Sequence, residues 1–237
     1  MKTIGLLGGM SWESTILYYQ LLNEGVRARC GGLHSAKILL HSVDFAEIEQ
    51  LQTSGRWDEA GRVLAAAAQG LEQNGAELIL ICTNLMHKVA PAIEASLQVP
   101  LLHIADATGR AIQAQGLGKI GLLGARYTME EGFYRQRLQD KFGLEVVIPA
   151  AAEREFVHRV IFDELCRGIF TDSSRQRYLE IIEGMRQQGA QGVVLGCTEI
   201  PLLVRQSDTE LPLFSTTALH AEAALEAAFA ELEAVVS

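Results

Sequence analysis

Two short motifs in the chain combine residue types that can move protons, and each motif follows an apolar run. Thr83–Asn84 comes after the run Leu78–Cys82, and Cys197–Thr198 comes after the run Gly192–Gly196. A thiol or a hydroxyl can exchange a proton with a carbon acid, and an adjacent amide or hydroxyl can hydrogen-bond a carboxylate. One such motif on each side of a small molecule would remove a proton from one face of a carbon atom and return one to the other. Racemisation and epimerisation require that geometry.

The chain also repeats the segments that carry these motifs. Ile4–Gly8 recurs letter for letter as Ile120–Gly124, and Gly75–Asn84 resembles Gly189–Thr198 at nearly the same distance along the chain. Two matches in the same order indicate a duplicated unit. In each half, short apolar runs alternate with longer helical patterns, which is typical of α/β proteins with mostly parallel sheets. The sequence therefore predicts two similar lobes, each a small doubly wound sheet that binds ligands beyond the carboxyl ends of its strands.

The composition restricts the class of protein further. Of the 237 residues, 49% are hydrophobic and 21% are charged, which excludes disordered, collagen-like and coiled-coil proteins. The net charge of −9 argues against nucleic acid as a partner. No segment approaches the ~20 apolar residues that span a bilayer, and no signal-peptide cleavage pattern follows the apolar N-terminus. We therefore expect a cytoplasmic protein with no membrane partner.

Cofactor and metal sites are not expected either. The four cysteines are too sparse for a disulfide framework or a structural zinc site. The glycine-rich turn at residues 5–9 matches neither a dinucleotide fingerprint nor a phosphate-binding loop. Nothing marks a Schiff-base lysine with a phosphate cradle, as pyridoxal phosphate would need.

The sequence resembles the aspartate/glutamate racemase family in three motifs: Leu195–Pro201, Thr83–His87 and Gly8–Met10. The resemblance covers essentially the whole chain and is strongest to the bacterial branch of broad-specificity amino-acid racemases. It implies two flavodoxin-like α/β domains related by a pseudo-twofold axis, with the active site in the cleft between them. It also implies an acid/base pair of two cysteines, no pyridoxal phosphate and no metal.

The resemblance further implies that the C-terminal helix packs on the first domain. The expected first domain is therefore 1–102 plus 212–237, and the expected second domain is 103–211.

The first motif departs from the family pattern, which usually reads Cys-Asn-Thr where this chain has Thr83–Leu85. The two halves can be aligned in two registers. Aligning the Cys-Thr dipeptides pairs Cys82 with Cys197. Aligning the Gly-Ala dipeptides that begin the repeated segments at residues 75 and 189 pairs Thr83 with Cys197. We adopt the second register, because side chains alternate along a strand and Cys82 and Thr83 cannot both point into the site. Cys82 is then interpreted as a small buried residue.

The predicted catalytic pair, Thr83 and Cys197, is chemically unequal. A thiol is readily ionised by a helix N-terminus, and a helix is expected over residues 199–205, directly after Cys197. A threonine hydroxyl is a much weaker acid and a poor general base. The sequence thus predicts a cofactor-independent amino-acid racemase with a directional bias. The family's handedness implies that Cys197 acts on the L-enantiomer.

Eight further residues are expected to bind substrate. Asn84 and Thr198 adjoin the acid/base positions and can hydrogen-bond an α-carboxylate. Gln52 falls where aspartate-specific relatives tend to carry an arginine, and its neutral amide would loosen the demand for an acidic side chain. Arg167 lies near the position of a carboxylate-binding lysine in relatives, or is a solvated arginine at a helix end. The complete predicted set is Met10, Ser11, Gln52, Asn84, Leu85, Arg167, Thr198 and Glu199.

Several alternatives stay open at this point. His87 either hydrogen-bonds Thr83 or a water, or is a structural histidine. The chain could instead be an isomerase or decarboxylase of a small dicarboxylic acid in the same superfamily, or a non-catalytic amino-acid binding protein. The expected partner is a small amino-acid substrate, and a homodimer is one candidate for the assembly.

Overall fold

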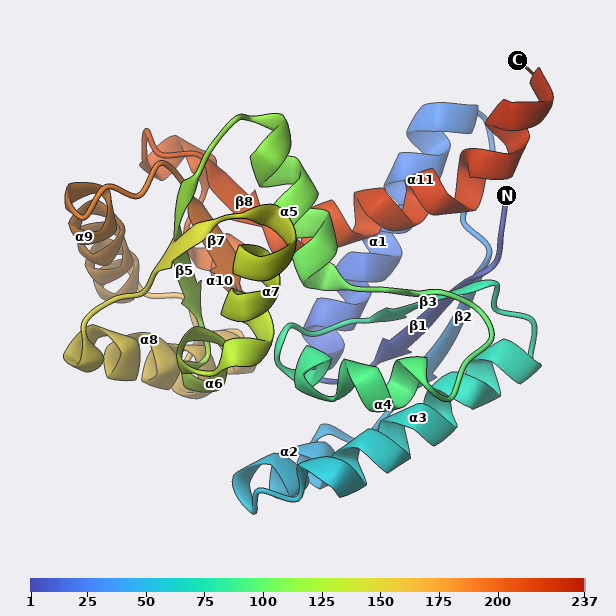
Figure 1. Cartoon of the computed structure of the whole chain (residues 1–237), viewed down its shortest axis with the longest axis horizontal. Helices are drawn as coiled ribbons and strands as arrows, with labels where there is room; N and C mark the ends of the chain where they lie inside the picture. The colour runs from blue at the N-terminus through green and yellow to red at the C-terminus, as the bar shows by residue number, and fades with distance from the viewer. Residues whose placement is uncertain (237) are drawn as a thin grey trace. The chain divides into compact units, whose positions relative to one another are not determined.

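The computed structural model describes residues 1–236, with side chains up to residue 230. The chain divides into two units, each with its own parallel four-stranded sheet (Figure 1). Unit 1 comprises Met1–Ile104 and the C-terminal segment from His220, and unit 2 comprises Ala105–Leu219. Within the described residues, no helix has both the length and the apolar character needed to cross a lipid bilayer.

The sheet of unit 1 has the strand order β2-β1-β3-β4, and all three pairings are parallel. Its strands are β1 (Ile4–Gly8), β2 (Ile38–Ser42), β3 (Leu78–Ile81) and β4 (Leu101–Leu102). The two central strands, β1 and β3, consist wholly of buried residues. Strands covered on both faces read as continuous apolar runs, which is why the sequence could locate them.

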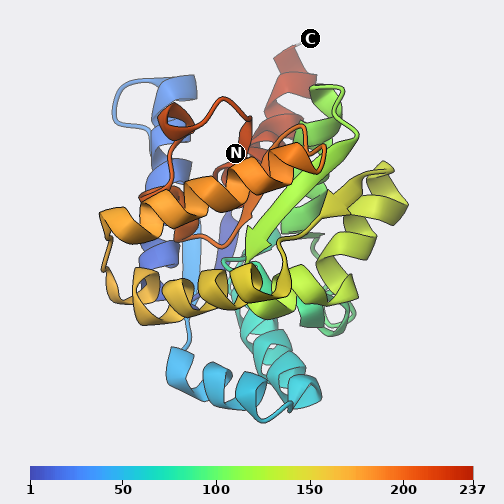
Figure 2. The ribbon, with the colours of Figure 1, turned by 90° about the vertical axis from the view of Figure 1, so that its left-hand side faces the viewer.

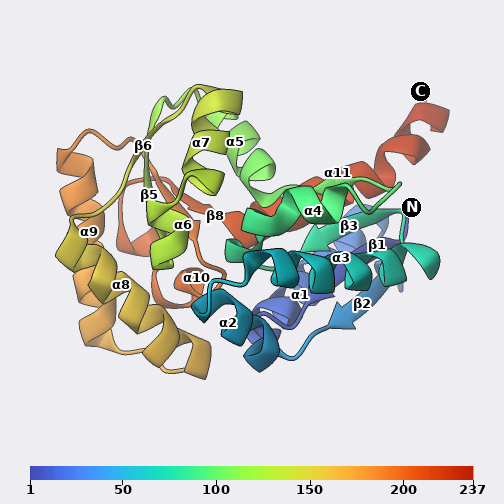
Figure 3. The ribbon, with the colours of Figure 1, turned by 60° about the horizontal axis from the view of Figure 1, so that its bottom comes forward.

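Helices cover both faces of this sheet (Figures 1 and 3). One face packs against α1 (Trp12–Cys30) and α11 (Thr216–Val236). The other face packs against a second group of helices, in which α3 and α4 run side by side. That group contains α2 (Phe45–Thr53), α3 (Trp57–Gln73), the short 3₁₀ helix η1 (Leu85–Val89) and α4 (Ala90–Glu94).

Side chains of β3 alternate between the two faces. Leu78, Leu80 and Cys82 lie in the core beneath α1 and α11, whereas Ile79 and Ile81 lie in the core beneath α3 and α4. Cys82 is fully buried in the first of these cores. The alternation predicted from the sequence therefore holds, and Cys82 packs as a small apolar residue.

The sheet of unit 2 repeats the topology of unit 1. Its order is β6-β5-β7-β8, again with only parallel pairings. The strands are β5 (Lys119–Gly124), β6 (Glu145–Val147), β7 (Val193–Gly196) and β8 (Leu213–Ser215). Strand by strand this is the order of unit 1, so the predicted duplication of an α/β unit is confirmed.

Two groups of helices accompany the sheet of unit 2. In Figure 2, α8 (Ala151–Asp163) and α9 (Asp172–Gln187) cross one face of the sheet, and the Tyr178 hydroxyl donates to Val157 O at 3.2 Å between them. The helices α5 (Ile104–Ala114) and α7 (Gly132–Phe142) pack closely together through Gly109 and the Phe142 ring. The remaining helices of this unit are α6 (Arg126–Glu130), η2 (Leu165–Arg167), α10 (Ile200–Leu203) and η3 (Gln206–Asp208).

The boundaries of the units differ from those predicted. The chain passes from unit 1 to unit 2 after Ile104 and returns after Leu219, rather than at 102/103 and 211/212. The second difference has a clear cause, because β8 pairs with β7 and belongs to the sheet of unit 2. Thr216, the first residue of α11, also donates its hydroxyl to Leu195 O at 2.9 Å.

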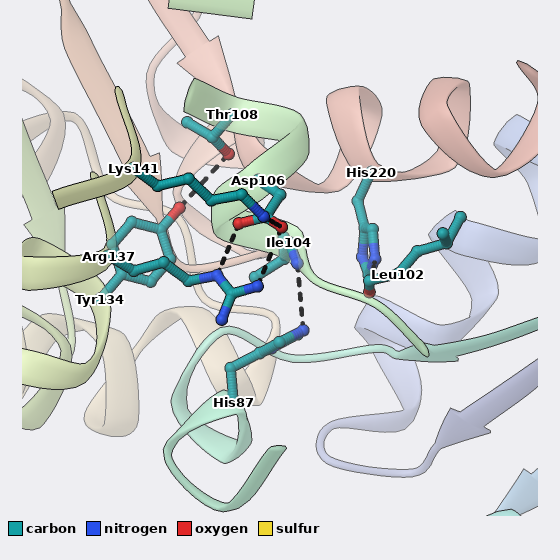
Figure 4. A network of polar contacts seen from close by, with 9 residues as sticks. All are labelled: His87, Leu102, Ile104, Asp106, Thr108, Tyr134, Arg137, Lys141 and His220. Carbon is teal, nitrogen blue, oxygen red and sulfur yellow. Dashed lines mark hydrogen bonds and ion pairs between the residues drawn. The ribbon is translucent and has the colours of Figure 1, made fainter. Parts of the chain in front are cut away.

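An ion-paired carboxylate explains why α5 belongs to unit 2 (Figure 4). Asp106, in the first turn of α5, accepts hydrogen bonds of 2.5 and 2.9 Å from the Arg137 guanidinium. It also accepts one of 2.5 Å from Lys141, and both cations lie on α7. Burial raises the pKa of the Asp106 carboxyl, but the hydrogen bonds and charges of Arg137 and Lys141 outweigh it and hold the pKa below its usual value.

Candidate functional site

The register of the two sheets shows which residues of the two units correspond. In unit 1, Leu7 of β1 pairs with Ile81, and in unit 2 the repeated Leu123 pairs with Leu195. Counting on from these pairs, Thr83 occupies the position of Cys197. By the same count, Cys82 is equivalent in position to Gly196, and Asn84 is equivalent to Thr198. The geometry therefore selects the second of the two sequence registers.

In unit 1, the turn after β3 leads directly into η1. Thr83 is half-buried, Asn84 is 3% exposed, and Leu85 begins η1. Burial raises the pKa of the neighbouring Cys82 thiol far above its usual value, so this thiol stays protonated in its core. Of the two adjacent proton donors, Thr83 is the one that is partly accessible.

Gln52 lies against the same turn, although it is far from it in sequence. Its side chain is 5% exposed, and Nε2 lies 3.0 Å from Sδ of Met86. Helix α2 presents Gln52 toward η1 and so joins it to the Thr83 motif. Nothing in the sequence marks this role of Met86, because its contact with Gln52 depends on how α2 packs.

The loop after β1 contributes Met10 and Ser11. The Met10 side chain lies in the core beneath α3 and α4. Only the main chain of Met10 is therefore placed to contact a ligand. Ser11 is the N-cap of α1, and its Oγ accepts from Ser14 N at 3.4 Å. Gly9 has φ +90°, and a Cβ there would lie 2.3 Å from Val43 O, so the loop needs glycine to pass so closely.

In unit 2, a pair of glycines ends the central strands. A Cβ on Gly124 would lie 2.8 Å from Gly196 O, and a Cβ on Gly196 would lie 2.9 Å from Leu123 O. The side chain of Thr128 packs over both glycines, because α6 begins at Arg126 and buries it. Helix α6 ends at Glu130, and α7 starts at Gly132.

Beyond β7, one carboxylate oxygen joins the three residues of the Cys-Thr-Glu motif. The Cys197 thiol donates to Glu199 Oε2 at 2.9 Å, and the Thr198 hydroxyl donates to the same oxygen at 2.8 Å. Glu199 and Thr198 are each 4% exposed, whereas Cys197 is half-buried. The structure therefore provides a thiol with a proton acceptor directly beside it.

The electrostatic setting of Cys197 is the reverse of the expected one. Burial raises the pKa of the Cys197 thiol, and the negative charge of Glu199 raises it further. Cys166 also contributes an increase, which places it near Cys197. The expected helix over 199–205 is only α10, Ile200–Leu203, which is too short for a substantial dipole. The main-chain hydrogen bond from Glu199, the N-cap of α10, does lower the pKa of Cys197, but burial and the charge of Glu199 outweigh it.

Arg167 lies in the same part of unit 2. It is the last residue of η2, next to Cys166, and it is exposed. An exposed guanidinium here is compatible with both sequence interpretations of Arg167. Tyr178 was not expected here: burial raises the pKa of its hydroxyl, and the charge of Cys197 raises it further.

Comparison with known proteins gives this geometry a context. The chain matches the Asp/Glu/hydantoin racemase family over residues 7–224. A Yersinia pestis protein whose crystal structure is described as that of a candidate Asp/Glu racemase is 57% identical, with a TM-score of 0.91, over 97% of this chain and 100% of that one. An aspartate racemase homologue from Pyrococcus horikoshii is 34% identical, with a TM-score of 0.85, over 96% and 99% of the two chains.

Among curated sequences, the broad-specificity amino-acid racemase RacX of Bacillus subtilis is 20% identical over 172 residues, which is 70% of each chain. The chain spans about half the length of the first glutamate racemases that it matches, 48% and 45%. The family match over residues 7–224 covers both units. The chain belongs to the Asp/Glu/hydantoin racemase family.

Proposed function

We propose that the protein is a cofactor-independent amino-acid racemase that uses Cys197 and Thr83 as its acid/base pair. The observation that carries the proposal is the register equivalence of these two residues in a duplicated sheet. Racemisation needs one proton-handling group for each face of the α-carbon, and a duplicated unit supplies one group from each half. Family membership and the similarity to racemases support the same reaction.

Cys197 would begin the reaction with help from Glu199. The thiol proton passes to Glu199 Oε2, 2.9 Å away, and leaves a thiolate. The thiolate then takes the α-proton of the L-enantiomer, and the electron pair of the broken C–H bond stays on the substrate as a carbanion. Because the pKa of Cys197 is raised by burial and by Glu199, the thiolate is scarce but strongly basic, as removal of a weakly acidic α-proton requires.

Thr83 would complete the inversion on the other face. Its hydroxyl gives a proton to the carbanion, directly or through a water. Solvent then reprotonates the Thr83 oxygen, and Glu199 releases to solvent the proton that it took from Cys197. A hydroxyl is a poor base, so the reverse abstraction from the D-enantiomer is slow. Because the equilibrium constant between enantiomers is one, kcat/KM must be equal in both directions. The predicted bias therefore appears in α-proton exchange without inversion. Cys197 should exchange the α-proton of the L-enantiomer, whereas Thr83 should not exchange that of the D-enantiomer.

The substrate would be a small α-amino acid whose side chain lies toward Gln52. Asn84, Thr198, the main chain near Met10 and Ser11, and an exposed Arg167 are the proposed carboxylate-binding groups. The buried amide of Gln52 carries no charge, so it does not demand an acidic side chain. The broad specificity of RacX fits such a site.

A panel of L- and D-amino acids, incubated in deuterated water and separated by chiral chromatography, tests the proposal. The wild type should invert at least one amino acid, and Cys197→Ser should lose about 10³-fold or more in rate while still binding the substrate. Cys30→Ser is the matched control, because Cys30 is exposed at the end of α1. Saturable binding with neither inversion nor exchange would make the protein a binding protein instead.

A further inference from the structure

His87 joins the Thr83 turn to a distant part of the main chain. Its Nδ1 lies 2.8 Å from Thr83 O. Its Nε2 lies 3.2 Å from the main-chain nitrogen of Ile104, which donates to it (Figure 4). The side chain is 2% exposed. Ile104 is the first residue of α5 and the last residue of unit 1 before the chain enters unit 2.

These two partners determine the protonation state of the ring. A main-chain carbonyl only accepts and a main-chain N–H only donates, so His87 carries its proton on Nδ1 and is neutral. Both ring nitrogens are then used by the backbone. His87 therefore cannot serve as the base for the Thr83 hydroxyl. It does hydrogen-bond Thr83, as one sequence interpretation proposed, but at the main-chain carbonyl.

Two further histidines pack against His87 within unit 1. The His103 ring lies at 4.4 Å from it and the His220 ring at 5.8 Å, both measured between centroids. His220 is held in turn, because its Nε2 donates to Leu102 O at 2.7 Å and its Nδ1 accepts from the Tyr18 hydroxyl at 2.8 Å. The orientation of the His87 ring is thus fixed from α1, α11 and the segment after β4.

We propose that His87 is a positioning residue for Thr83: its Nδ1–H holds the Thr83 carbonyl and thereby fixes the direction of the Thr83 side chain. This inference rests on the proposed racemase function. A proton donor must meet the carbanion at hydrogen-bond distance, so a turn that is free to rotate would return fewer protons to the second face. Proton removal by Cys197 does not depend on this turn.

Two amide variants separate the two bonds of His87. In His87→Asn, the side-chain amide ends at about the position of Nδ1 and can still donate to Thr83 O. In His87→Gln, the amide ends at about the position of Nε2 and can still accept from the Ile104 N–H. Each variant keeps one main-chain bond and loses the other, so a merely structural role predicts similar losses from both.

The readout is the ratio of inversion to α-deuteration with retained configuration, measured in deuterated water on an amino acid that the wild type inverts. Both events are counted on the same folded molecules, so partial unfolding of a variant cancels from the ratio. We expect His87→Gln to lower the ratio about fivefold, the equivalent of one hydrogen bond of about 1 kcal/mol. His87→Asn should stay close to the wild-type ratio, and Thr83→Ala sets the lower limit.

Three results would count against the inference. Equal ratios in the two amide variants, or a lower ratio in His87→Asn than in His87→Gln, would overturn the role of His87 and leave the racemase proposal standing. A wild type that neither exchanges nor inverts any amino acid of the panel would overturn both.

Discussion

The Cys197 thiol donates a hydrogen bond of 2.9 Å to Oε2 of Glu199, a carboxylate that is only 4% exposed. The pair combines two opposing effects. The charge of Glu199 raises the pKa of Cys197 and makes the thiolate rare, yet its oxygen is placed to accept the thiol proton. This relationship suits a thiolate that forms only as the reaction starts.

Glu199→Gln should separate these two effects. Removing the negative charge should lower the pKa of Cys197, so alkylation of the thiol should begin at a lower pH than in the wild type. Turnover should nevertheless fall about 10²-fold, because an amide oxygen does not take up the thiol proton. Alkylation rates as a function of pH, together with racemisation rates, check both parts.

Thr198→Val provides the matched control for the alkylation experiment. It removes the second hydrogen bond to Oε2 of Glu199 but leaves the charge in place. Its alkylation profile should therefore stay close to that of the wild type. A Glu199→Gln variant with wild-type turnover would exclude Glu199 as the proton acceptor.

Thr83→Cys should make the acid/base pair symmetrical. A thiol near its ordinary pKa of about 8.5 is a far better proton carrier than a hydroxyl, so α-proton exchange from the D-enantiomer should rise by about tenfold or more. Thr83→Val, which has nearly the same shape and no hydroxyl, should abolish inversion while exchange from the L-enantiomer continues. Equally fast D-enantiomer exchange in the wild type and in Thr83→Cys would contradict the proposal that Thr83 is a weaker acid/base group than Cys197.

The sequence predicted the fold well where strands are buried on both faces. The runs Leu78–Cys82 and Gly192–Gly196 read as continuous apolar segments, and they overlap β3 and β7 to within one residue at each end. The boundary near residue 212 was less predictable. It depends on the pairing of β8, a strand of only three residues, with β7.

The composition of the candidate site was only partly predictable. Strand alternation correctly places Cys82 in the same core as Leu78 and Leu80, because alternation is a local property of the chain. The contact of Gln52 with Met86 and the bond of His87 to Ile104 join segments that meet only after packing. The raised pKa of Cys197 likewise depends on burial and on the orientation of Glu199, which residue spacing does not reveal.

The stability of the chain in acid should depend on Asp106. Its pKa is lower in the folded protein than the ordinary value of 3.8, because Arg137 and Lys141 outweigh the opposing effect of burial. The carboxylate therefore stabilises the fold above its unfolded pKa, and this contribution is lost as the pH falls through the lower, folded pKa. Asp106→Asn should lose about 1–3 kcal/mol at neutral pH, since it removes charged hydrogen bonds between α5 and α7.

Urea unfolding at neutral pH and at about pH 3 measures this contribution. The difference in unfolding free energy between wild type and Asp106→Asn should shrink in acid, because the wild-type carboxylate is then increasingly protonated. Asp140→Asn, at an exposed position of α7, is the control and should change stability little at either pH. A difference that is independent of pH would mean that packing, and not charge, holds α5.

Gly9 should tolerate no side chain, because the loop after β1 passes the main chain of Val43 too closely. A Cβ at Gly9 would lie 2.3 Å from Val43 O and 2.6 Å from Val43 N, and the φ of +90° is itself unfavourable for other residues. Gly9→Ala should therefore cost about 2 kcal/mol or more in unfolding free energy.

Gly70 is the matched control: it lies inside α3, and a Cβ there would meet nothing within 4 Å. Gly70→Ala should stabilise the chain by about 0.5–1 kcal/mol, since alanine restricts the unfolded state and favours helix. Thermal and urea unfolding of the two variants check the contrast, and a stable Gly9→Ala would mean that the loop between β1 and Ser11 can move away from Val43 at little cost.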